Sequence, residues 1–254
     1  MSYNKNMKKS NIKDEFISTL SHEIRTPLTS IKGFSQTMLS GWDKLNDEKK
    51  KEFLNIILNQ SQRLINLVEN VLNVAKIDSD TEKLIPVEID INKIIKNCIN
   101  IVQMNYKDFE FSFIPSKNNL YSLADNDKTQ QILINILDNA AKYSVNSKTI
   151  EIKTFNKNDF NVFSIKNFGS FIEKENIDKI FEKFYRIDSY LTTSTQGSGL
   201  GLYIAKNLIG KMGGKIEVNS SKEDNFTEFL IYLPVYEVEK LTKNIELKNP
   251  ESKV

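Results

Sequence analysis

One histidine, His22, is the residue of this chain whose surroundings point most clearly to chemistry. The carboxylate of the next residue, Glu23, can hold one imidazole nitrogen, which fixes the tautomer and makes the other nitrogen more nucleophilic. On a helix with about 100° between residues, His22 lies opposite the apolar Ile24, and Thr26 follows one turn later on the same exposed face. A lone exposed histidine is ordinarily only solvated. With these neighbours, the pattern favours a nucleophilic histidine.

Two asparagines and a lysine share one face of a helix that is predicted to follow Asp125 and to end near Lys142. Asn135, Asn139 and Lys142 stand at positions i, i+4 and i+7 of this helix. An amide oxygen is a suitable ligand for Mg²⁺, and a lysine ammonium suits phosphate. The spacing is equally compatible with a polar stripe that faces solvent, so alone it leaves both interpretations open.

The run GSGLGL places Gly197, Gly199 and Gly201 directly before another predicted helix. Glycine lets the backbone approach a phosphate closely, and the N-terminus of a helix favours negative charge. The run does not follow a predicted strand in a βαβ unit, which excludes a Rossmann dinucleotide site. A phosphate-binding loop of another kind is still compatible with it.

Two long helices are predicted to carry the histidine. They are expected over residues 9–39 and 48–77, separated by Gly41 and by a helix cap at Asn46 or Asp47. A hairpin of two helices cannot close a core alone, so two copies are expected to form a dimeric four-helix bundle. The expected seam of the second helix, with spacings of three and four, consists of Leu54, Ile57, Ser61, Leu64, Val68, Val71 and Ala75, flanked by Leu58, Ile65 and Leu72.

A polar linker, residues 78–86, separates this hairpin from a region of mixed pattern. Strand-like runs such as FEFSFIP, KTIEIKTF, NVFSIKN, GKIEVNS and FTEFLIYLP alternate with predicted helices. The predicted fold class is therefore α+β, a helical hairpin followed by an α/β sandwich with a mixed sheet and helices on one face. The charged tail after Pro234 is expected to be frayed.

Composition excludes several classes of function. The 254 residues include 35 basic and 33 acidic side chains, and a net charge of +2 argues against nucleic-acid binding. One cysteine and one histidine exclude a disulfide framework, a cysteine-rich zinc site and any site that needs two histidine ligands. No stretch approaches the roughly 18 consecutive apolar residues of a membrane span, so no membrane insertion is predicted. Only three basic residues are arginines, namely Arg25, Arg63 and Arg186, so a planar guanidinium is rare in this chain.

The segment FISTLSHEIRTPL resembles the H box of the sensor histidine kinases of two-component systems, in which the histidine is phosphorylated. Over residues 10–78 the chain looks like the dimerisation and phosphotransfer domain of that family. The resemblance implies that His22 is the phosphoacceptor and that Glu23 acts as a base. It also implies that Thr26 orients water when such kinases dephosphorylate their partners.

The resemblance continues to about residue 235 and implies a nucleotide site. The run NILDNAAKY resembles the N box, so Asn139 would coordinate Mg²⁺, Asn135 would support the site, Lys142 would contact phosphate and Tyr143 would pack near the nucleotide. The segment IDKIFEKFYR resembles the phenylalanine box, and GSGLGL resembles the second glycine box. Residues 187–195 are expected to form a mobile lid over ATP. The further nucleotide-binding residues implied by these boxes are Tyr185, Arg186, Gly197, Gly199, Leu200 and Gly201.

One box departs from the family pattern D-x-G-x-G, whose aspartate accepts a hydrogen bond from the adenine amino group. Here Asn167 takes the place of the aspartate, Gly169 is kept, and Phe171 replaces the second glycine. The amide oxygen of Asn167 is expected to accept from adenine, as a weaker acceptor than a carboxylate. This substitution affects the expected affinity for adenine more than the expected chemistry.

Together these features predict a protein histidine kinase that uses ATP and Mg²⁺ and passes its phosphoryl group to an aspartate of a response regulator. The expected domains are the hairpin at 10–78, the ATP-binding domain at 87–236 and a charged tail at 237–254. The chain is expected in the cytoplasm, either as a soluble kinase or as the core of a membrane-anchored receptor. Two alternatives stay open: a nucleotide-dependent pseudokinase or phosphatase scaffold, favoured by the altered adenine box, and an ATPase of the gyrase type, disfavoured by the H box.

Overall fold

The computed structural model describes residues 2–145, 147–187 and 197–236. Two compact units make up the chain. The first contains the residues up to Glu82 together with Ile180–Ile204, and the second contains Lys83–Lys179 together with the chain from Ala205 onward. The expected charged tail and residues 188–195 of the expected lid lie outside the described residues.

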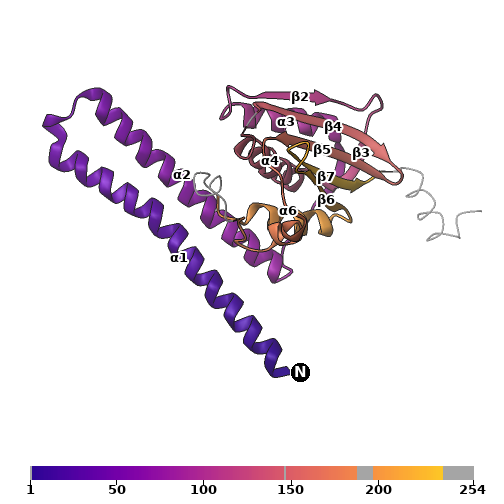
Figure 1. Cartoon of the computed structure of the whole chain (residues 1–254), viewed down its shortest axis with the longest axis horizontal. Coiled ribbons are helices and arrows are strands. Elements are labelled where there is room, and N and C mark those ends of the chain that lie inside the picture. Colours follow the sequence, from indigo (N-terminus) through magenta and orange to yellow (C-terminus); the bar gives the residue numbers. More distant parts are fainter. Residues whose placement is uncertain (1, 146, 188–196, 237–254) are drawn as a thin grey trace, which may run out of the picture. The chain divides into compact units, whose positions relative to one another are not determined.

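Two long antiparallel helices dominate the first unit (Figure 1). Helix α1 spans Ser2–Gly41 and helix α2 spans Asp47–Asp78, with a short 3₁₀ turn, η1, at Trp42–Lys44 between them. Asn46 caps α2, because its side-chain oxygen accepts a hydrogen bond of 2.8 Å from the backbone N–H of Lys49. The helical hairpin predicted from the sequence is confirmed.

The hairpin buries one side of α2 and leaves another apolar side uncovered. Phe34 of α1 packs against Phe53 of α2 with ring centroids 5.1 Å apart, and Leu67 and Val74 are 5% and 2% exposed. A second set of apolar side chains is between 47% and 64% exposed in the single chain. This set consists of Ile17 and Leu28 on α1 and of Leu54, Leu58, Ile65, Val68 and Leu72 on α2. The apolar seam predicted from the sequence is thus only partly covered within one hairpin.

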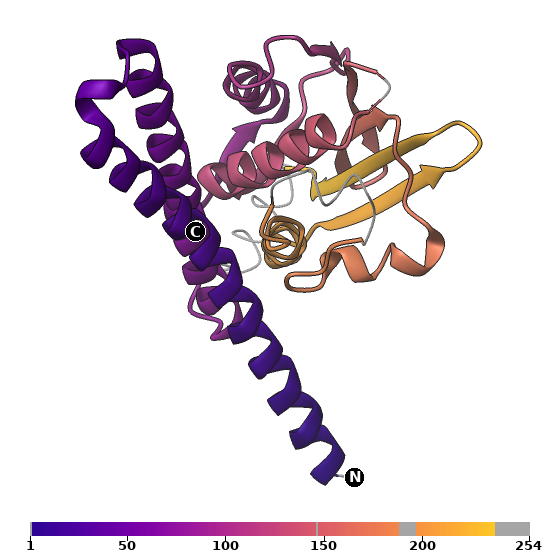
Figure 2. The ribbon, with the colours of Figure 1, turned by 60° about the vertical axis from the view of Figure 1, so that its left-hand side comes forward.

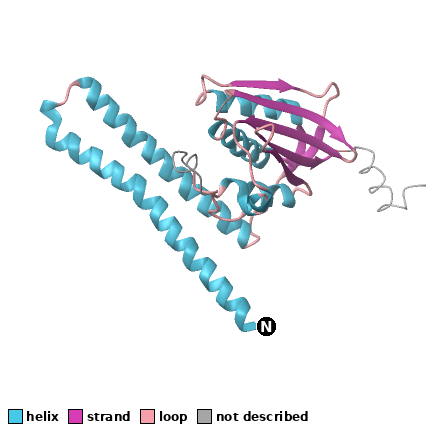
Figure 3. Ribbon diagram, in the orientation of Figure 1, coloured by secondary structure: helices cyan, strands magenta, loops and turns pink. Residues whose placement is uncertain are grey.

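A five-stranded mixed sheet forms the framework of the second unit (Figure 3). Its strand order is β2-β4-β5-β7-β6. Strand β2 runs parallel to β4, and every other neighbouring pair is antiparallel, which confirms the predicted mixed sheet. The strands are β2 Glu110–Ile114, β4 Thr149–Lys157, β5 Phe160–Phe168, β6 Lys215–Ser221 and β7 Phe226–Pro234.

Helices α3 (Ile91–Gln103) and α4 (Asn126–Lys142) pack against each other, and α4 contacts β5 of the sheet (Figure 2). Each begins at an aspartate: Asp90 accepts from the N–H of Lys93 at 3.1 Å, and Asp125 accepts from the N–H of Lys128 at 3.0 Å. The predicted apolar side of α4 is buried, namely Ile132, Leu133, Ile136, Leu137 and Ala140. This burial turns the other side of α4, with its asparagines, away from the core.

The remaining regular elements are short. Helix α6 spans Gly201–Lys211, and two 3₁₀ turns, η2 and η3, span Lys174–Asn176 and Lys179–Phe181. No helix of the described residues has the length and apolar character that a membrane span needs.

A two-stranded ribbon contains one strand that the sequence pattern does not predict. Strand β1 (Pro86–Asp90) pairs antiparallel with β3 (Tyr121–Asp125). The run VEI within β1 is strand-like, whereas YSLAD is short and ends in residues that strands disfavour. The ribbon positions the start of α4, because the Asp125 carboxylate that caps α4 also accepts from the backbone N–H of Ile85 at 2.9 Å.

Candidate functional site

The histidine lies on the exposed face of α1, as the helical period predicts. His22 and Thr26 are both exposed, and the Thr26 hydroxyl donates to the backbone carbonyl of His22 at 3.2 Å. Pro27, which follows, is buried and lies inside α1 without ending it. The imidazole is therefore presented to solvent by a continuous helix.

The carboxylate of Glu23 has a partner on the other helix of the hairpin. Its Oε2 lies 3.1 Å from Nη2 of Arg63, and this contact is both a hydrogen bond and an ion pair. The carboxylate that is predicted to hold the imidazole of His22 thus has one oxygen on α2, because neighbouring residues of a helix point in directions about 100° apart.

The N-box residues lie on one side of α4 in the second unit. The amide nitrogen Nδ2 of Asn135 is buried and has no hydrogen-bond partner among the described residues. Buried polar groups are nearly always paired in proteins, so an orphaned donor at this position fits an acceptor such as a nucleotide oxygen or a bound water. Asn139, one turn later, is half-buried. The donor set of this face is thus compatible with a nucleotide and a magnesium ion.

Lys142 has a protein partner in the structure. Its Nζ lies 2.5 Å from Oδ2 of Asp138, one turn earlier on α4. The other carboxylate oxygen of Asp138 accepts from the Tyr106 hydroxyl at 2.7 Å. Burial, followed by the hydrogen bond to Asp138 and its charge, raises the pKa of Tyr106, so the phenol stays protonated as a donor. A phosphate that binds Lys142 competes with Asp138 for the ammonium group.

The altered adenine box lies at the end of β5. Asn167 is buried, and its Nδ2 donates to the backbone carbonyl of Tyr143 at 3.4 Å and to the hydroxyl of Ser170 at 3.3 Å. Gly169 has φ of 97°, a left-handed conformation that suits glycine, and its N–H donates to the backbone carbonyl of Asn225 at 2.8 Å. The structure thereby brings Asn167 to the C-terminal end of α4, beside Tyr143.

Thr227 is a buried polar neighbour of Asn167 that the sequence analysis missed. The two residues are paired directly across β5 and β7, and the Thr227 hydroxyl donates to the carbonyl of Ser170 at 3.1 Å. The only signal in the sequence was a threonine in the mostly apolar strand FTEFLIYLP. This end of the sheet therefore carries a cluster of three polar residues linked by hydrogen bonds, Asn167, Ser170 and Thr227.

The glycine run and the phenylalanine box meet within the first unit. Gly199 has φ of +66°, and a Cβ added there would lie 2.7 Å from the carbonyl carbon of Phe184. The Phe184 N–H donates to the carbonyl of Gly199 at 3.0 Å. Only glycine therefore allows this close approach. Leu200 is fully buried, and Gly201 begins α6.

The other residues of these boxes are Gly197, Tyr185 and Arg186. A Cβ added at Gly197 would meet no atom within 4 Å among the described residues, so no steric reason requires glycine there. Tyr185 and Arg186 are both half-buried at the C-terminal end of the phenylalanine box.

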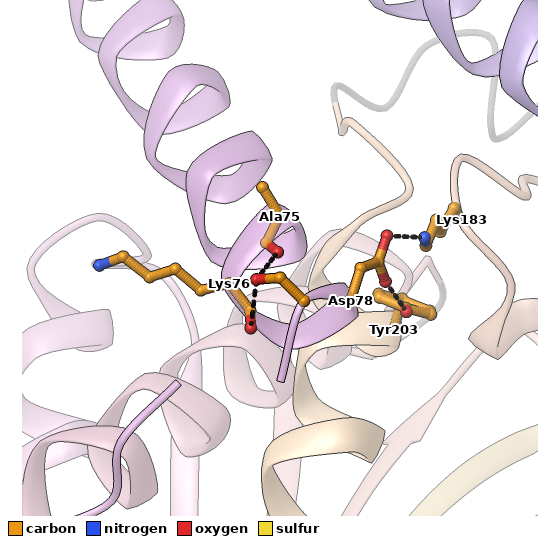
Figure 4. A network of polar contacts seen from close by, with 6 residues as sticks. Ala75, Lys76, Asp78, Lys183 and Tyr203 are labelled. Atoms are coloured by element: carbon orange, nitrogen blue, oxygen red, sulfur yellow. Dashed lines mark hydrogen bonds and ion pairs between the residues drawn. The ribbon is translucent and has the colours of Figure 1, made fainter. Parts of the chain in front are cut away.

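Asp78, the last residue of α2, joins two segments that are distant in sequence (Figure 4). One carboxylate oxygen bonds the ammonium of Lys183, and the other accepts from the Tyr203 hydroxyl at 2.6 Å. Ser79 ends the helix, its hydroxyl donating to the carbonyl of Ala75 at 2.7 Å. No pattern in the sequence indicated this cluster.

The pKa of Asp78 follows from these contacts. Partial burial raises the pKa of Asp78. The hydrogen bonds from Lys183 and Tyr203 and the charge of Lys183 together lower it by more, so the net pKa lies below its ordinary value. A carboxyl group with a lowered folded-state pKa stabilises the fold above its unfolded pKa. That contribution disappears as the pH falls through the lowered folded-state value.

We therefore expect Asp78→Asn to lower the thermal unfolding midpoint at pH 7, because the ion pair with Lys183 is lost. The gap between wild type and variant should stay constant down to about pH 5, begin to shrink near the unfolded pKa of aspartate at about pH 4, and disappear only as the pH falls through the lower folded-state pKa. Thermal scans from pH 3 to pH 8 measure it. Asp108→Asn is the control, because the Asp108–Lys148 pair is 79% and 65% exposed. A gap that persists unchanged to pH 3 would contradict this assignment.

Two protein-family models match the chain in succession. Residues 12–80 match the His Kinase A (phospho-acceptor) domain, and residues 124–237 match the histidine kinase-, DNA gyrase B- and HSP90-like ATPase domain. The sensor protein kinase WalK of Staphylococcus aureus is 34% identical over 227 residues, which are 89% of this chain and 54% of that relative. WalK of strain Newman has the same identity, with 37% of its length covered. The chain thus spans about half the length, or less, of these curated relatives.

Solved histidine kinase structures are also similar to this chain. The histidine kinase ThkA, crystallised in complex with the response regulator protein TrrA, matches with a TM-score of 0.69 and 27% identity, over 92% of this chain and 65% of that chain. The histidine kinase AdeS of Acinetobacter baumannii matches with a TM-score of 0.67 and 21% identity, over 85% of this chain and 98% of that chain, which is a likeness of fold. With a phospho-acceptor hairpin followed by an ATPase domain, the chain belongs to the sensor histidine kinase family.

Proposed function

We propose that this chain phosphorylates itself on His22 with ATP and passes the phosphoryl group to an aspartate of a response regulator. The observation that carries the proposal is the exposed His22 on the hairpin that matches the phospho-acceptor domain, in one chain with a matched ATPase domain. Because the reaction consumes ATP, we place the chain in the cytoplasm.

In the proposed reaction a ring nitrogen of neutral His22 attacks the γ-phosphorus of ATP. The bond between that phosphorus and the oxygen bridging to the β-phosphate breaks, and ADP leaves with the bond's electron pair. The N–H of the other ring nitrogen becomes more acidic as positive charge develops on the ring, and Glu23 is the nearest carboxylate along the chain to accept its proton. Positioning and charge neutralisation supply most of the acceleration in such transfers.

The nucleotide would be held by residues of α4, of the altered adenine box, of the phenylalanine box and of the glycine run. Asn135 and Lys142 on α4 offer an amide and an ammonium to phosphate, and Asn139 offers its amide oxygen to Mg²⁺. Mg²⁺, when bound, neutralises phosphate charge, and it is usually held by one or two protein oxygens together with substrate phosphates. Tyr143, Asn167 and Gly169 would bind the adenine side. The remaining proposed nucleotide contacts are Tyr185, Arg186, Gly197, Gly199, Leu200 and Gly201.

We also propose a response regulator as partner and a phosphatase role for Thr26. The similar kinase ThkA was crystallised with the response regulator protein TrrA, which supports a receiver domain as the partner class. Thr26 is exposed one turn from His22 and its oxygen can accept from water. It is therefore suited to orienting a water molecule towards a phosphorylated aspartate.

The uncovered apolar side of the hairpin supports a homodimer. Leu58, Ile65 and Leu72 recur every seven residues on α2 and are 64%, 50% and 55% exposed in a single chain. Two hairpins that bring such rows together form a four-helix bundle, and the matched phospho-acceptor domain supports this assembly.

Ile65→Asp should therefore convert the dimer into a folded monomer. The aspartate is tolerated in a single chain, where the site is half-exposed, but in the bundle it would be an unpaired buried charge. Light scattering on the full chain gives the mass, and Asn59→Asp, at an exposed polar position of α2, is the control. A dimer that survives Ile65→Asp would place the interface elsewhere.

Removal of His22 tests the proposed reaction directly. Wild type incubated with γ-labelled ATP and Mg²⁺ should acquire acid-labile, alkali-stable label, because a phosphoramidate bond forms. His22→Gln should acquire none, while binding ATP with unchanged affinity and unfolding at the same temperature. Label on His22→Gln would overturn the assignment of the phosphoacceptor, and an unlabelled wild type that still binds ATP would favour the pseudokinase or phosphatase scaffold.

The affinity for adenine should depend on Asn167. Asn167→Ala removes the buried amide, so we expect ATP binding to weaken by about 1–2 kcal/mol, roughly tenfold, and the preference for ATP over GTP to fall. Asn167→Asp keeps an acceptor but turns an oxygen towards the Tyr143 carbonyl, where the amide now donates. We therefore expect Asn167→Asp to keep the preference for ATP over GTP but to unfold at a lower temperature. Binding calorimetry with non-hydrolysable analogues of ATP and GTP measures affinity and preference, thermal unfolding measures stability, and exposed Asn118→Ala is the control. Equal binding by all variants would show that adenine is recognised elsewhere.

A further inference from the structure

The Glu23–Arg63 pair joins the residue next to the phosphoacceptor to the opposite helix of the hairpin. The two residues are 40 positions apart in sequence and their charged atoms are 3.1 Å apart. Their side chains are only 19% and 25% exposed, whereas those of the surface pair Asp108–Lys148 are 79% and 65% exposed. Solvent therefore screens the Glu23–Arg63 pair less than an ordinary surface ion pair.

The contact engages only one side of the carboxylate. Arg63 bonds Oε2, and no second hydrogen bond to the Glu23 carboxylate occurs among the described residues. Oε1 is thus open to another donor. His22 is exposed, and exposed side chains change rotamer rapidly, so the imidazole can turn towards a carboxylate that stays in place.

The identity of the cation also matters. Of the 35 basic residues only three are arginines, and one of them stands at this position. A guanidinium is planar and delocalised and fixes the direction of a carboxylate, whereas a lysine ammonium is a rotatable point charge on a flexible stem. Arg63 therefore suits the task of holding Glu23 in one rotamer.

We propose that Arg63 is a positioning residue for Glu23 in the phosphorylation of His22, which rests on the function proposed above. Arg63 holds Oε2, and Oε1 accepts the N–H proton of the imidazole as its other nitrogen bonds the γ-phosphorus and ADP departs. Arg63 does not touch the reacting atoms. Its effect comes from fixing the base before the reaction, so less conformational freedom is lost on the way to the transition state.

The test is a double-mutant cycle on the autophosphorylation rate of the full chain with Mg²⁺ and γ-labelled ATP. A positioned general base contributes about 10²–10⁴-fold, so Arg63→Gln should lower kcat about tenfold or more. The KM for ATP should be unchanged, because Arg63 is not placed at the nucleotide. Arg63→Lys should recover part of the loss. In the Glu23→Gln background, Arg63→Gln should have no further effect.

Two controls separate this role from a structural one. Lys51→Gln removes an exposed cation of α2 and should leave the rate unchanged. Light scattering and thermal unfolding verify that each variant stays dimeric and folded. If the double-mutant cycle gives a coupling between Glu23 and Arg63 in the free energy of unfolding but none in kcat, the pair has only a structural role.

Other outcomes overturn the proposal in distinguishable ways. A faster Arg63→Gln would mean that Arg63 restrains the base rather than positions it. An equal loss in the Glu23→Gln background would mean that Arg63 acts independently of Glu23. A wild type that acquires no label would contradict both the proposed function and the positioning role of Arg63. A wild type that is labelled at the same rate as Arg63→Gln would contradict the positioning role alone.

Discussion

The helical period, about 100° per residue, is the constraint on which the phospho-acceptor hairpin depends. Two adjacent residues of α1 cannot face the same way, so His22 faces solvent while Glu23 turns to α2 and meets Arg63. The packing of Phe34 against Phe53 keeps the two helices together along the hairpin. Because α2 lies alongside, one helix provides both an accessible imidazole and a partly buried carboxylate with a partner. On an isolated helix the imidazole would still be accessible, but the carboxylate would lose its partner and its burial.

The same period shapes α4, but there the polar face is already engaged with the protein. Its apolar residues are buried, and Lys142 on the polar side bonds Asp138. At the end of β5, the amide of Asn167 bonds Tyr143. A phosphate that binds Lys142 competes with Asp138 for the ammonium, which reduces the net gain of that new bond to about 1 kcal/mol, whereas adenine would donate to Oδ1 of Asn167 and leave the Nδ2 bond to Tyr143 in place. Asn135 differs, because its Nδ2 is buried and without a partner among the described residues. Pairing it would remove a penalty rather than exchange one bond for another.

Local signals predicted most of the fold, and contacts between distant segments were out of their reach. The hairpin, the caps at Asn46 and Asp125 and the alternation of the long strands are encoded within a few residues each. Strand β3 was missed because it is short and stabilised by pairing with β1 rather than by its own propensity. The motif residues were identifiable by resemblance, but not their partners, since neither the Glu23–Arg63 pair nor the Asp78 cluster has a local signature. The scarcity of arginine was the one hint at Arg63.

Asp78 illustrates how such a distant contact gains specificity. A carboxylate at the last residue of a helix faces the negative end of the helix dipole, which is unfavourable for an isolated α2. The ammonium of Lys183 and the hydroxyl of Tyr203 reverse that effect, as the lowered pKa of Asp78 indicates. Lys183 and Tyr203 stand on either side of the glycine run in the sequence. The acidic helix end is therefore favourable only when both flanks of that run are bound to it. A neutral residue would have been better for the helix alone, so the aspartate serves the contact rather than the helix.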